Sequence, residues 1–214
     1  TGFAIAQLAL NDPFPDMFIY SNTAPRKDDT EKRHENAGEK FAYGLLDNGI
    51  AIAAVHAHFA FSFVKPHLQD FRIINVLNHG SQFRSRDFYP QAVAGLLSDT
   101  KSKYLGAKIP LTTIPDIPPA KIMYIDGYGN IKTTIRSSTV KFKSGEKIRV
   151  SIIGNVRTGV YADTNFSVKT GDLAFAPGSS GGHDRFMEIF LRSGNAARHF
   201  KYPPVETKVK IEKF

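Results

Sequence analysis

Hydrophobic and polar positions alternate along two short runs that flank a turn in the second half of the chain. The runs are Ile122–Ile125 and Ile131–Ile135, and the turn is Asp126-Gly127-Tyr128-Gly129-Asn130. This pattern predicts a β-hairpin. The turn also holds a carboxylate, an aromatic ring and an amide, which can bind an ammonium, stack on a purine and pair with an adenine edge. The same residue types are equally typical of a plain β-turn.

The first half of the chain alternates strand and helix patterns. Apolar runs at 17–20, 41–46, 50–55 and 73–77 predict strands, with a tight hairpin at Asp47-Asn48-Gly49. Helical spacing appears in 1–10 and again from Asp87 to Leu97, where Asp87 is the expected N-cap and Pro90 lies in the first turn. This order predicts a partial α/β domain over residues 1–105.

A proline-rich segment separates the two halves. Residues 106–119 contain four prolines and predict an extended linker. Short alternating runs dominate after it, at 122–125, 131–135, 148–153, 173–175, 187–190 and 205–211. They predict an all-β antiparallel, barrel-like domain over residues 120–214, with a short helix near 195–200.

Composition narrows the functional classes. The 214 residues include no cysteine, so disulfides and thiolate metal sites are excluded. No apolar run approaches the ~18 residues of a membrane span, and no secretory signal pattern is present, so we expect a cytoplasmic protein without membrane contact. The net charge is +8, but the basic residues are scattered, so nucleic-acid binding is not expected. His56 and His58 lack a third ligand at suitable spacing, so no metal site is expected.

Further motifs occur in a recognisable order. Tyr43–Gly49 reads Y-G-L-L-D-N-G, Gln82–Pro90 reads Q-F-R-S-R-D-F-Y-P, and the D-G-Y-G-N turn is followed by G-S-S-G, E-I and, at Gly194–Ala197, G-N-A-A. Taken together, they resemble the S-adenosyl-L-methionine (SAM) hydroxide adenosyltransferase family, whose relatives include the fluorinase and chlorinase enzymes. The resemblance covers most of the chain.

The resemblance implies a fold, a substrate and a set of ligand contacts. It implies a homotrimer whose active site lies between the N-terminal domain of one subunit and the C-terminal domain of its neighbour. The substrate is SAM, and a small nucleophile attacks ribose C5′. Asp126 would bind the methionine ammonium, Tyr128 would flank adenine and Asn130 would read its edge. Ser180 would help to bind the methionine carboxylate, and Ala197 would offer its backbone to adenine.

The N-terminal half departs from the family pattern. Hydroxide-using members surround the water with an Asp, an Arg and a His, but Ser21, Asp28 and Arg84 stand at those positions. Arg26, nearby in the sequence, could substitute for the family arginine from a displaced position. Arginine cannot act as a base near neutral pH. Arg84, Arg86 and Arg26 could instead gather positive charge around an anionic nucleophile. The family's opening segment, with its ribose-binding T-D-F-G aspartate, has no counterpart.

Two functions remain open on the sequence. The first is a divergent SAM-cleaving adenosyltransferase or hydrolase that forms adenosine and methionine or uses another small nucleophile. The alternative is a non-catalytic relative that binds SAM or adenosine, or an oligomeric scaffold. A third interpretation, an RNA-binding β-barrel, would show steeply salt-dependent binding. We also expect Phe3, Ile5 and Leu8 to expose apolar surface that a trimer would cover.

Overall fold

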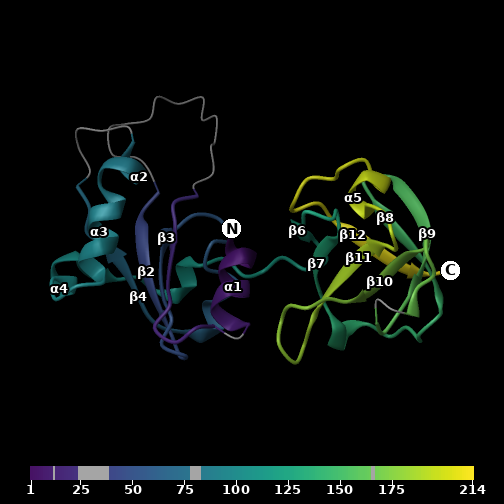
Figure 1. Ribbon diagram of the computed structural model, residues 1–214, viewed down its shortest axis with the longest axis horizontal. Coiled ribbons are helices and arrows are strands. Elements are labelled where there is room, and N and C mark those ends of the chain that lie inside the picture. The colour runs from purple at the N-terminus through teal and green to yellow at the C-terminus, as the bar shows by residue number, and fades with distance from the viewer. Residues whose placement is uncertain (12, 24–38, 78–82, 165–166) are drawn as a thin grey trace. The chain divides into compact units, whose positions relative to one another are not determined.

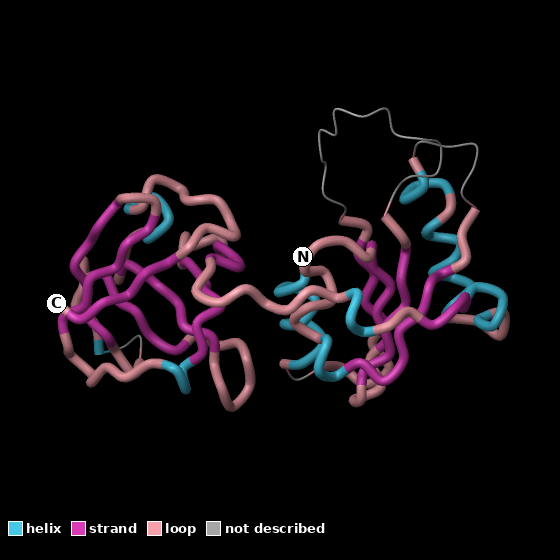
Figure 2. The backbone as a smooth tube through the Cα atoms, turned by 180° about the vertical axis from the view of Figure 1, so that it is seen from behind, coloured by secondary structure: helices cyan, strands magenta, loops and turns pink. Residues whose placement is uncertain are grey.

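The chain consists of two units with different secondary structure. The computed structural model describes residues 1–11, 13–23, 39–77, 83–164 and 167–214 (Figure 1). The units are Thr1–Ile117 and Pro118–Phe214, and each is described by itself. The first is mixed α/β, and strands dominate the second (Figure 2). The sequence therefore predicted the mixed α/β character of the first unit and the strand-rich character of the second.

The first unit is built on a five-stranded sheet in the order β1-β3-β2-β4-β5. The strands are β1 (Phe18–Ser21), β2 (Phe41–Leu46), β3 (Ala51–Val55), β4 (Leu68–Ile74) and β5 (Leu105–Lys108). β1 and β3 are parallel, and the other neighbours are antiparallel. The predicted hairpin joins β2 to β3.

Both faces of this sheet are buried because apolar residues occupy both sides of its pleat. In β2, Ala42 packs in the core beneath α1 (Gly2–Leu10), whereas Phe41 packs in a second core with α3 (Tyr89–Leu96). Figure 1 shows α1 on one side of the strands and α3 on the other, beside α2 (Arg84–Asp87) and α4 (Lys101–Tyr104). The 3-10 helices of this unit are η1 (Lys65–His67) and η2 (Leu111–Thr113).

The first helix does not present the apolar surface that the sequence predicted. Phe3 and Ile5 are buried, and the Phe3 ring packs edge-on against Phe63 at a centroid distance of 6.1 Å. Of the three expected residues, Leu8 alone is exposed. The prediction of a three-residue apolar patch is therefore wrong, because the unit's own core covers two of its members.

The helix expected over Asp87–Leu97 is two helices. α2 ends at Asp87 and α3 begins at Tyr89, with Phe88 outside the helical conformation at φ −123°. Asp87 is thus the last residue of α2 and not an N-cap. Pro90 has no N–H to donate to a preceding turn, so the chain starts a new helix with the proline in its first turn.

Part of the proline-rich segment belongs to the first sheet. β5 pairs with β4, and the Ile109 N–H donates to the Phe71 carbonyl at 2.9 Å. Ile114 is 1% exposed within the first core. The first unit therefore extends to Ile117, and the prolines that follow open the second unit.

The second unit is a seven-stranded sheet in the order β12-β8-β9-β10-β11-β7-β6. The strands are β6 (Ile122–Ile125), β7 (Ile131–Arg136), β8 (Lys147–Ile152), β9 (Asn155–Tyr161), β10 (Leu173–Pro177), β11 (Phe186–Leu191) and β12 (Val209–Lys213); the helices are η3 (Ser137–Thr139) and α5 (Ala196–His199). β9 and β10 are parallel, so the expectation of a wholly antiparallel domain is wrong at this pair.

The two edges of this sheet are joined at one end. The Ile122 N–H donates to the Thr207 carbonyl and the Val209 N–H donates to the Ala120 carbonyl, each at 2.8 Å. These bonds curl the sheet around its larger apolar core, to which Ile131, Phe175 and Ile189 contribute. A smaller apolar cluster of the same unit includes Ala174 and Phe190. The hairpin turn at 126–130 lies at the opposite ends of β6 and β7 from this junction.

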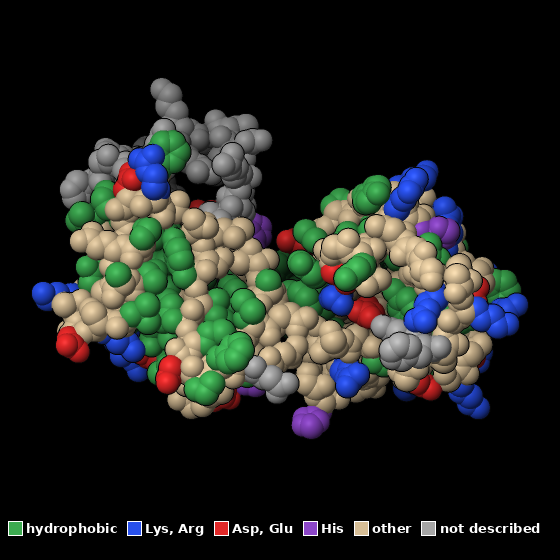
Figure 3. Space-filling view, viewed as in Figure 1, with side chains coloured by type: hydrophobic (Ala, Val, Ile, Leu, Met, Phe, Trp, Pro, Cys, Tyr) green, Lys and Arg blue, Asp and Glu red, His purple; other side chains and the backbone are tan. Residues whose placement is uncertain are grey.

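Charged side chains of both signs are spread over the face of each unit that Figure 3 shows. In the view of Figure 3, Lys and Arg side chains lie apart from one another on both units, with Asp and Glu among them. Within the described ranges, no helix is both long and apolar enough to cross a membrane.

Candidate functional site

The Asp126 carboxylate organises the hairpin turn between β6 and β7. Its Oδ1 accepts the backbone N–H of Tyr128 at 3.0 Å and that of Asn130 at 2.9 Å. Its Oδ2 accepts the Asn130 side-chain amide at 3.0 Å. Gly129 closes the turn at φ +83° and donates its N–H to the Asp126 carbonyl. Asp126 therefore fixes the backbone of the turn and also the orientation of the Asn130 amide.

The hairpin turn is joined to the turn that begins α5. The Ala197 N–H donates to the Gly129 carbonyl at 2.8 Å. Asn195 is the N-cap of α5, and its side chain accepts the Arg198 N–H at 2.7 Å. A Cβ on Gly129 would lie 2.2 Å from the Asn195 side chain, so the two turns are in direct contact. The structure thus brings the predicted residues of both motifs together.

Two tyrosines at the joined turns are exposed. Tyr128 is 82% exposed at the tip of the hairpin, which leaves its ring open for stacking. Tyr202 is 66% exposed, and its N–H donates to the Ala197 carbonyl at 2.7 Å. The Ala197 N–H therefore already donates a hydrogen bond within the protein, and the Ala197 carbonyl already accepts one. Tyr202 was not predicted, since no motif singles it out in the sequence.

A group of buried charges lies directly behind the hairpin turn. Lys132 on β7 donates to Glu188 Oε2 on β11 at 2.6 Å, and its Nζ lies 3.8 Å from Asp126 Oδ2. The side chains are 13%, 6% and 20% exposed for Lys132, Glu188 and Asp126. Lys132 and Glu188 are paired across neighbouring strands. Neither residue of this pair was predicted to have a role, since they lie 56 positions apart in the sequence.

Ser180 lies in the segment that connects β10 to β11. It is buried, and its carbonyl accepts the Phe186 N–H at 2.8 Å. The segment that follows, residues 182–185, is held by Asp184, which accepts hydrogen bonds from the Ser137 and Ser138 side chains and from the Ser138 backbone. The Ser138 N–H, together with the two hydroxyls, lowers the pKa of Asp184. Nearby Gly178 lies against the Glu188 carboxylate, so this segment borders the buried charges.

The N-terminal candidates lie in the first unit. Ser21 ends β1, and its hydroxyl donates to Thr23 Oγ1 at 3.4 Å. The preceding residue, Tyr20, donates its hydroxyl to the Ser85 carbonyl at 3.4 Å, which brings the end of β1 beside α2 and Arg84. Ser21 and the α2 arginines therefore come from neighbouring elements.

Arg86 has an acidic partner of its own. Its Nε and Nη2 donate to the two carboxylate oxygens of Asp87, at 2.6 and 3.1 Å, and its guanidinium lies over the Phe83 ring at 4.9 Å. These hydrogen bonds raise the pKa of Arg86. Arg26 and Asp28, the other residues proposed here, lie outside the described residues.

His56 and His58 do not lie together on one face of a strand. β3 ends at Val55, so His56 and His58 follow the strand, and His58 has φ 44°. Burial lowers the pKa of the His56 imidazole, and the positive charge of Lys40 lowers it further. In the part of the chain that the structure describes, no group of three or more His, Asp or Glu side chains could hold a metal ion.

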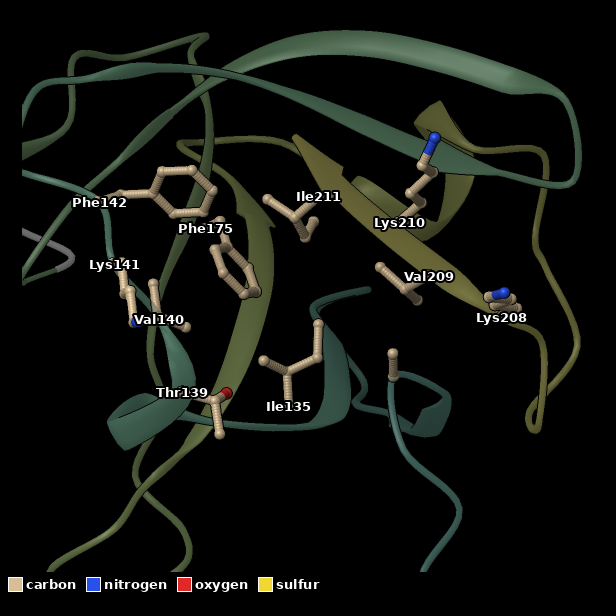
Figure 4. Close-up of a pocket in the computed structure, with 11 residues that line it drawn as sticks. Ile135, Thr139, Val140, Lys141, Phe142, Phe175, Lys208, Val209, Lys210 and Ile211 are labelled. Atoms are coloured by element: carbon tan, nitrogen blue, oxygen red, sulfur yellow. The ribbon is translucent and has the colours of Figure 1, made fainter. Parts of the chain in front are cut away.

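A cavity of about 500 Å³ opens elsewhere in the second unit (Figure 4). Ile135, Phe142, Phe175 and Ile211 line it with apolar side chains, and lysines such as Lys208 stand at its edge. It contains none of the predicted ligand-binding residues. Its position near the start of β12 and the end of β7 separates it from the hairpin turn at the other end of β7.

Comparison with known families identifies the second unit. Residues 120–207 match the family model of the SAM hydroxide adenosyltransferase C-terminal domain. The second unit belongs to the SAM hydroxide adenosyltransferase family. The match includes both joined turns, Ser180 and the Lys132–Glu188 pair, and it links the chain to SAM-related chemistry.

Two solved structures share the fold of the chain. An uncharacterized conserved protein from Thermotoga maritima is 17% identical with a TM-score of 0.66, and the match covers 83% of this chain and 72% of that protein. A conserved hypothetical protein from Thermus thermophilus is 16% identical with a TM-score of 0.65, and the match covers 98% of this chain and 80% of that protein. At these identities the likeness shows the fold alone. No curated protein matches the chain.

Proposed function

We propose that the chain binds an adenosyl ligand at the joined turns of the second unit and cleaves SAM at ribose C5′, as an adenosyltransferase or hydrolase. The observation that carries the proposal is the Ala197 N–H bond to the Gly129 carbonyl within a matched family domain. The exposed Tyr128 ring and the Asn130 amide that Asp126 orients belong to the same hairpin turn, and this supports the proposal. In this proposal the ring stacks on adenine and the amide pairs with its edge.

The proposed reaction is a single displacement. A lone pair of the nucleophile forms a bond to C5′ while the C5′–S bond breaks, and the bonding electrons return to sulfur. Methionine leaves as a neutral thioether. When the nucleophile is water, adenosine forms and a proton passes to solvent. A sulfonium is a good leaving group, so the protein contributes chiefly by positioning and desolvating the reactants.

The N-terminal residues argue against rapid hydrolysis. Ser21 and Arg84 stand where the family resemblance implies an acid and a histidine, and neither supplies a base near neutral pH. A positioned general acid or base typically contributes about 10²–10⁴-fold. Arg84 and Arg26 would favour an anionic nucleophile. We infer that release of adenosine in water is slow and that small anions are the better partners.

One observation favours the alternative of a non-catalytic binder. The Arg86 guanidinium is bonded to both oxygens of Asp87, which neutralises a charge that the anion site would need. A relative that keeps the adenosyl surface of the second unit but lacks a charged nucleophile site in the first would bind SAM or adenosine without cleaving it.

The test is calorimetric titration with SAM and with adenosine, followed by chromatography of each mixture for adenosine and methionine. We expect saturable binding, and Tyr128→Ala should weaken it roughly 5- to 160-fold because a stacked base contributes about 1–3 kcal/mol. Phe214→Ala is the matched control, since Phe214 is 67% exposed in the same unit but lies at the end of β12. The proposal would be refuted if neither SAM nor adenosine bound. Binding without products would select the non-catalytic alternative.

A further inference from the structure

The charged group beside the hairpin turn consists of Asp126, Lys132 and Glu188. Its two carboxylates and one ammonium give it a formal charge of −1, and Lys132 lies between the acids, 2.6 Å from Glu188 Oε2 and 3.8 Å from Asp126 Oδ2. Charges that are largely buried are screened less by salt than charges on the surface. The group therefore attracts a cation, and Asp126 is the most exposed of its three members.

The Asp126 carboxylate has one acceptor position left. A carboxylate offers about four such positions. Three of them receive the Tyr128 N–H, the Asn130 N–H and the Asn130 side-chain amide. The Lys132 ammonium is 3.8 Å away, which is beyond hydrogen-bond distance, so it fills none. A ligand ammonium that takes the fourth position would share the carboxylate with the three donors of the turn.

Glu188 holds Lys132 away from Asp126. The Glu188 side chain is 6% exposed, and a Cβ on Gly178 would lie 3.0 Å from its Oε2, so Glu188 acts on a ligand only through Lys132. A buried ammonium that loses its counter-ion is strongly unfavourable. Without the Glu188 charge, Lys132 would take Asp126 as its counter-ion. That pair carries no net charge and competes with a ligand for the same carboxylate.

We propose that Glu188 is a positioning residue that engages Lys132 and thereby keeps the Asp126 carboxylate negative and open to a ligand ammonium. The site then favours adenosyl ligands whose 5′-thio side chain carries an ammonium, as that of SAM does. This inference rests on the proposed adenosyl site and assigns it a further residue, which acts through its charge and not by contact with the ligand.

The test compares two thioether nucleosides by calorimetry. S-adenosyl-3-thiopropylamine carries an ammonium on its side chain, and S-methyl-5′-thioadenosine does not; neither has a sulfonium or a carboxylate. We call the ratio of their affinities the ammonium preference. The wild-type chain should show a preference of about tenfold, the effect of one hydrogen bond between charged groups. Glu188→Gln is nearly isosteric and should reduce it to about twofold or less, with binding of S-methyl-5′-thioadenosine unchanged within about twofold.

Two further variants test the charge directly. The double variant Lys132→Met, Glu188→Gln returns the formal charge to −1, carried by Asp126 alone, and should recover the wild-type preference. Lys132→Met alone makes the formal charge −2, should keep the preference at or above the wild-type value, and decides the matter if Glu188→Gln does not fold. The inference is overturned if folded Glu188→Gln keeps the preference or weakens both ligands alike, or if Lys132→Met loses the preference.

A control and the wild-type titrations complete the design. Glu146→Gln removes another acid of the second unit that is paired with a lysine, Lys213, and should leave the ammonium preference unchanged. Wild-type protein that binds both nucleosides equally overturns the role of Glu188 and leaves the adenosyl site standing. Wild-type protein that binds neither nucleoside, nor SAM or adenosine, overturns the adenosyl site itself and the inference with it.

Discussion

Contact between the hairpin turn and the α5 turn can be tested with Gly129→Ala. Gly129 has φ +83°, and an added Cβ would lie 2.2 Å from the Asn195 side chain. The left-handed conformation costs a non-glycine residue about 1–2 kcal/mol. Moving Asn195 away would remove the N-cap of α5, worth about 1 kcal/mol, and strain the Ala197–Gly129 hydrogen bond by a similar amount. The expected loss of stability is about 3–4 kcal/mol.

Two other glycines separate these contributions. Gly154→Ala has the same conformational strain, at φ +71°, but an added Cβ meets nothing within 4 Å, so it should cost about 1–2 kcal/mol. Gly127 lies in the same turn as Gly129 without a left-handed φ and also has open space, so Gly127→Ala should change stability by less than about 0.5 kcal/mol. The difference between Gly129→Ala and Gly154→Ala reports the contact with Asn195.

Thermal unfolding followed by circular dichroism measures these differences. A destabilisation of about 3 kcal/mol should lower the melting temperature of the second unit by roughly 12–24 °C. The first unit's transition should stay in place. Combining Gly129→Ala with Asn195→Ala relieves the clash, so the double variant should be more stable than the sum of its single effects by about 1 kcal/mol. The contact would be refuted if Gly129→Ala and Gly154→Ala lost equal stability and if the effect of Asn195→Ala simply added to that of Gly129→Ala.

Two further predictions concern the first unit and the assembly. Because the pKa of His56 is lowered in the folded state, the unfolded chain takes up a proton first as the pH falls below about 6.5. Stability of the first unit should therefore decline from about pH 6.5 downward until the folded His56 also titrates, and His56→Gln should flatten this decline in urea unfolding between about pH 8 and about pH 5; an identical slope in the variant would contradict the assignment. If the trimer implied by the family resemblance forms, light scattering at micromolar concentration should give a mass near three times 23.7 kDa, and a clean monomer would contradict both the trimer and a site shared between subunits.

Local patterns predicted the hairpins well because neighbouring residues decide them. The β2–β3 and β6–β7 hairpins were both predicted from alternation around turn residues. β9 was missed, because its exposed and part-buried positions do not give a clear apolar face. Its Gly159 lies so close to β10 that a Cβ would be 2.7 Å from the Leu173 carbonyl, a contact that exists only in the folded sheet. The parallel pairing of β9 with β10 could not be predicted for the same reason.

The candidate site shows the same difference between features set by neighbouring residues and features set by the folded sheet. Motif order identified Asp126, Asn130 and Ala197, and the structure brings their turns together. The Lys132–Glu188 pair depends on the register between β7 and β11, which no short-range pattern specifies. The two turns could therefore be predicted, but the Lys132–Glu188 ion pair next to them could not.

The function of a motif residue depends on which of its atoms can still contact a ligand. The chain keeps an acid, a ring and an amide at the spacing of the family motif. Yet the acid already accepts three hydrogen bonds from its own protein, whereas the ring is 82% exposed. A ligand can therefore gain from Tyr128 by adding a contact, but at Asp126 it competes with donors that are already in place. Recognition at this surface should thus rest chiefly on the adenine ring, through the exposed Tyr128.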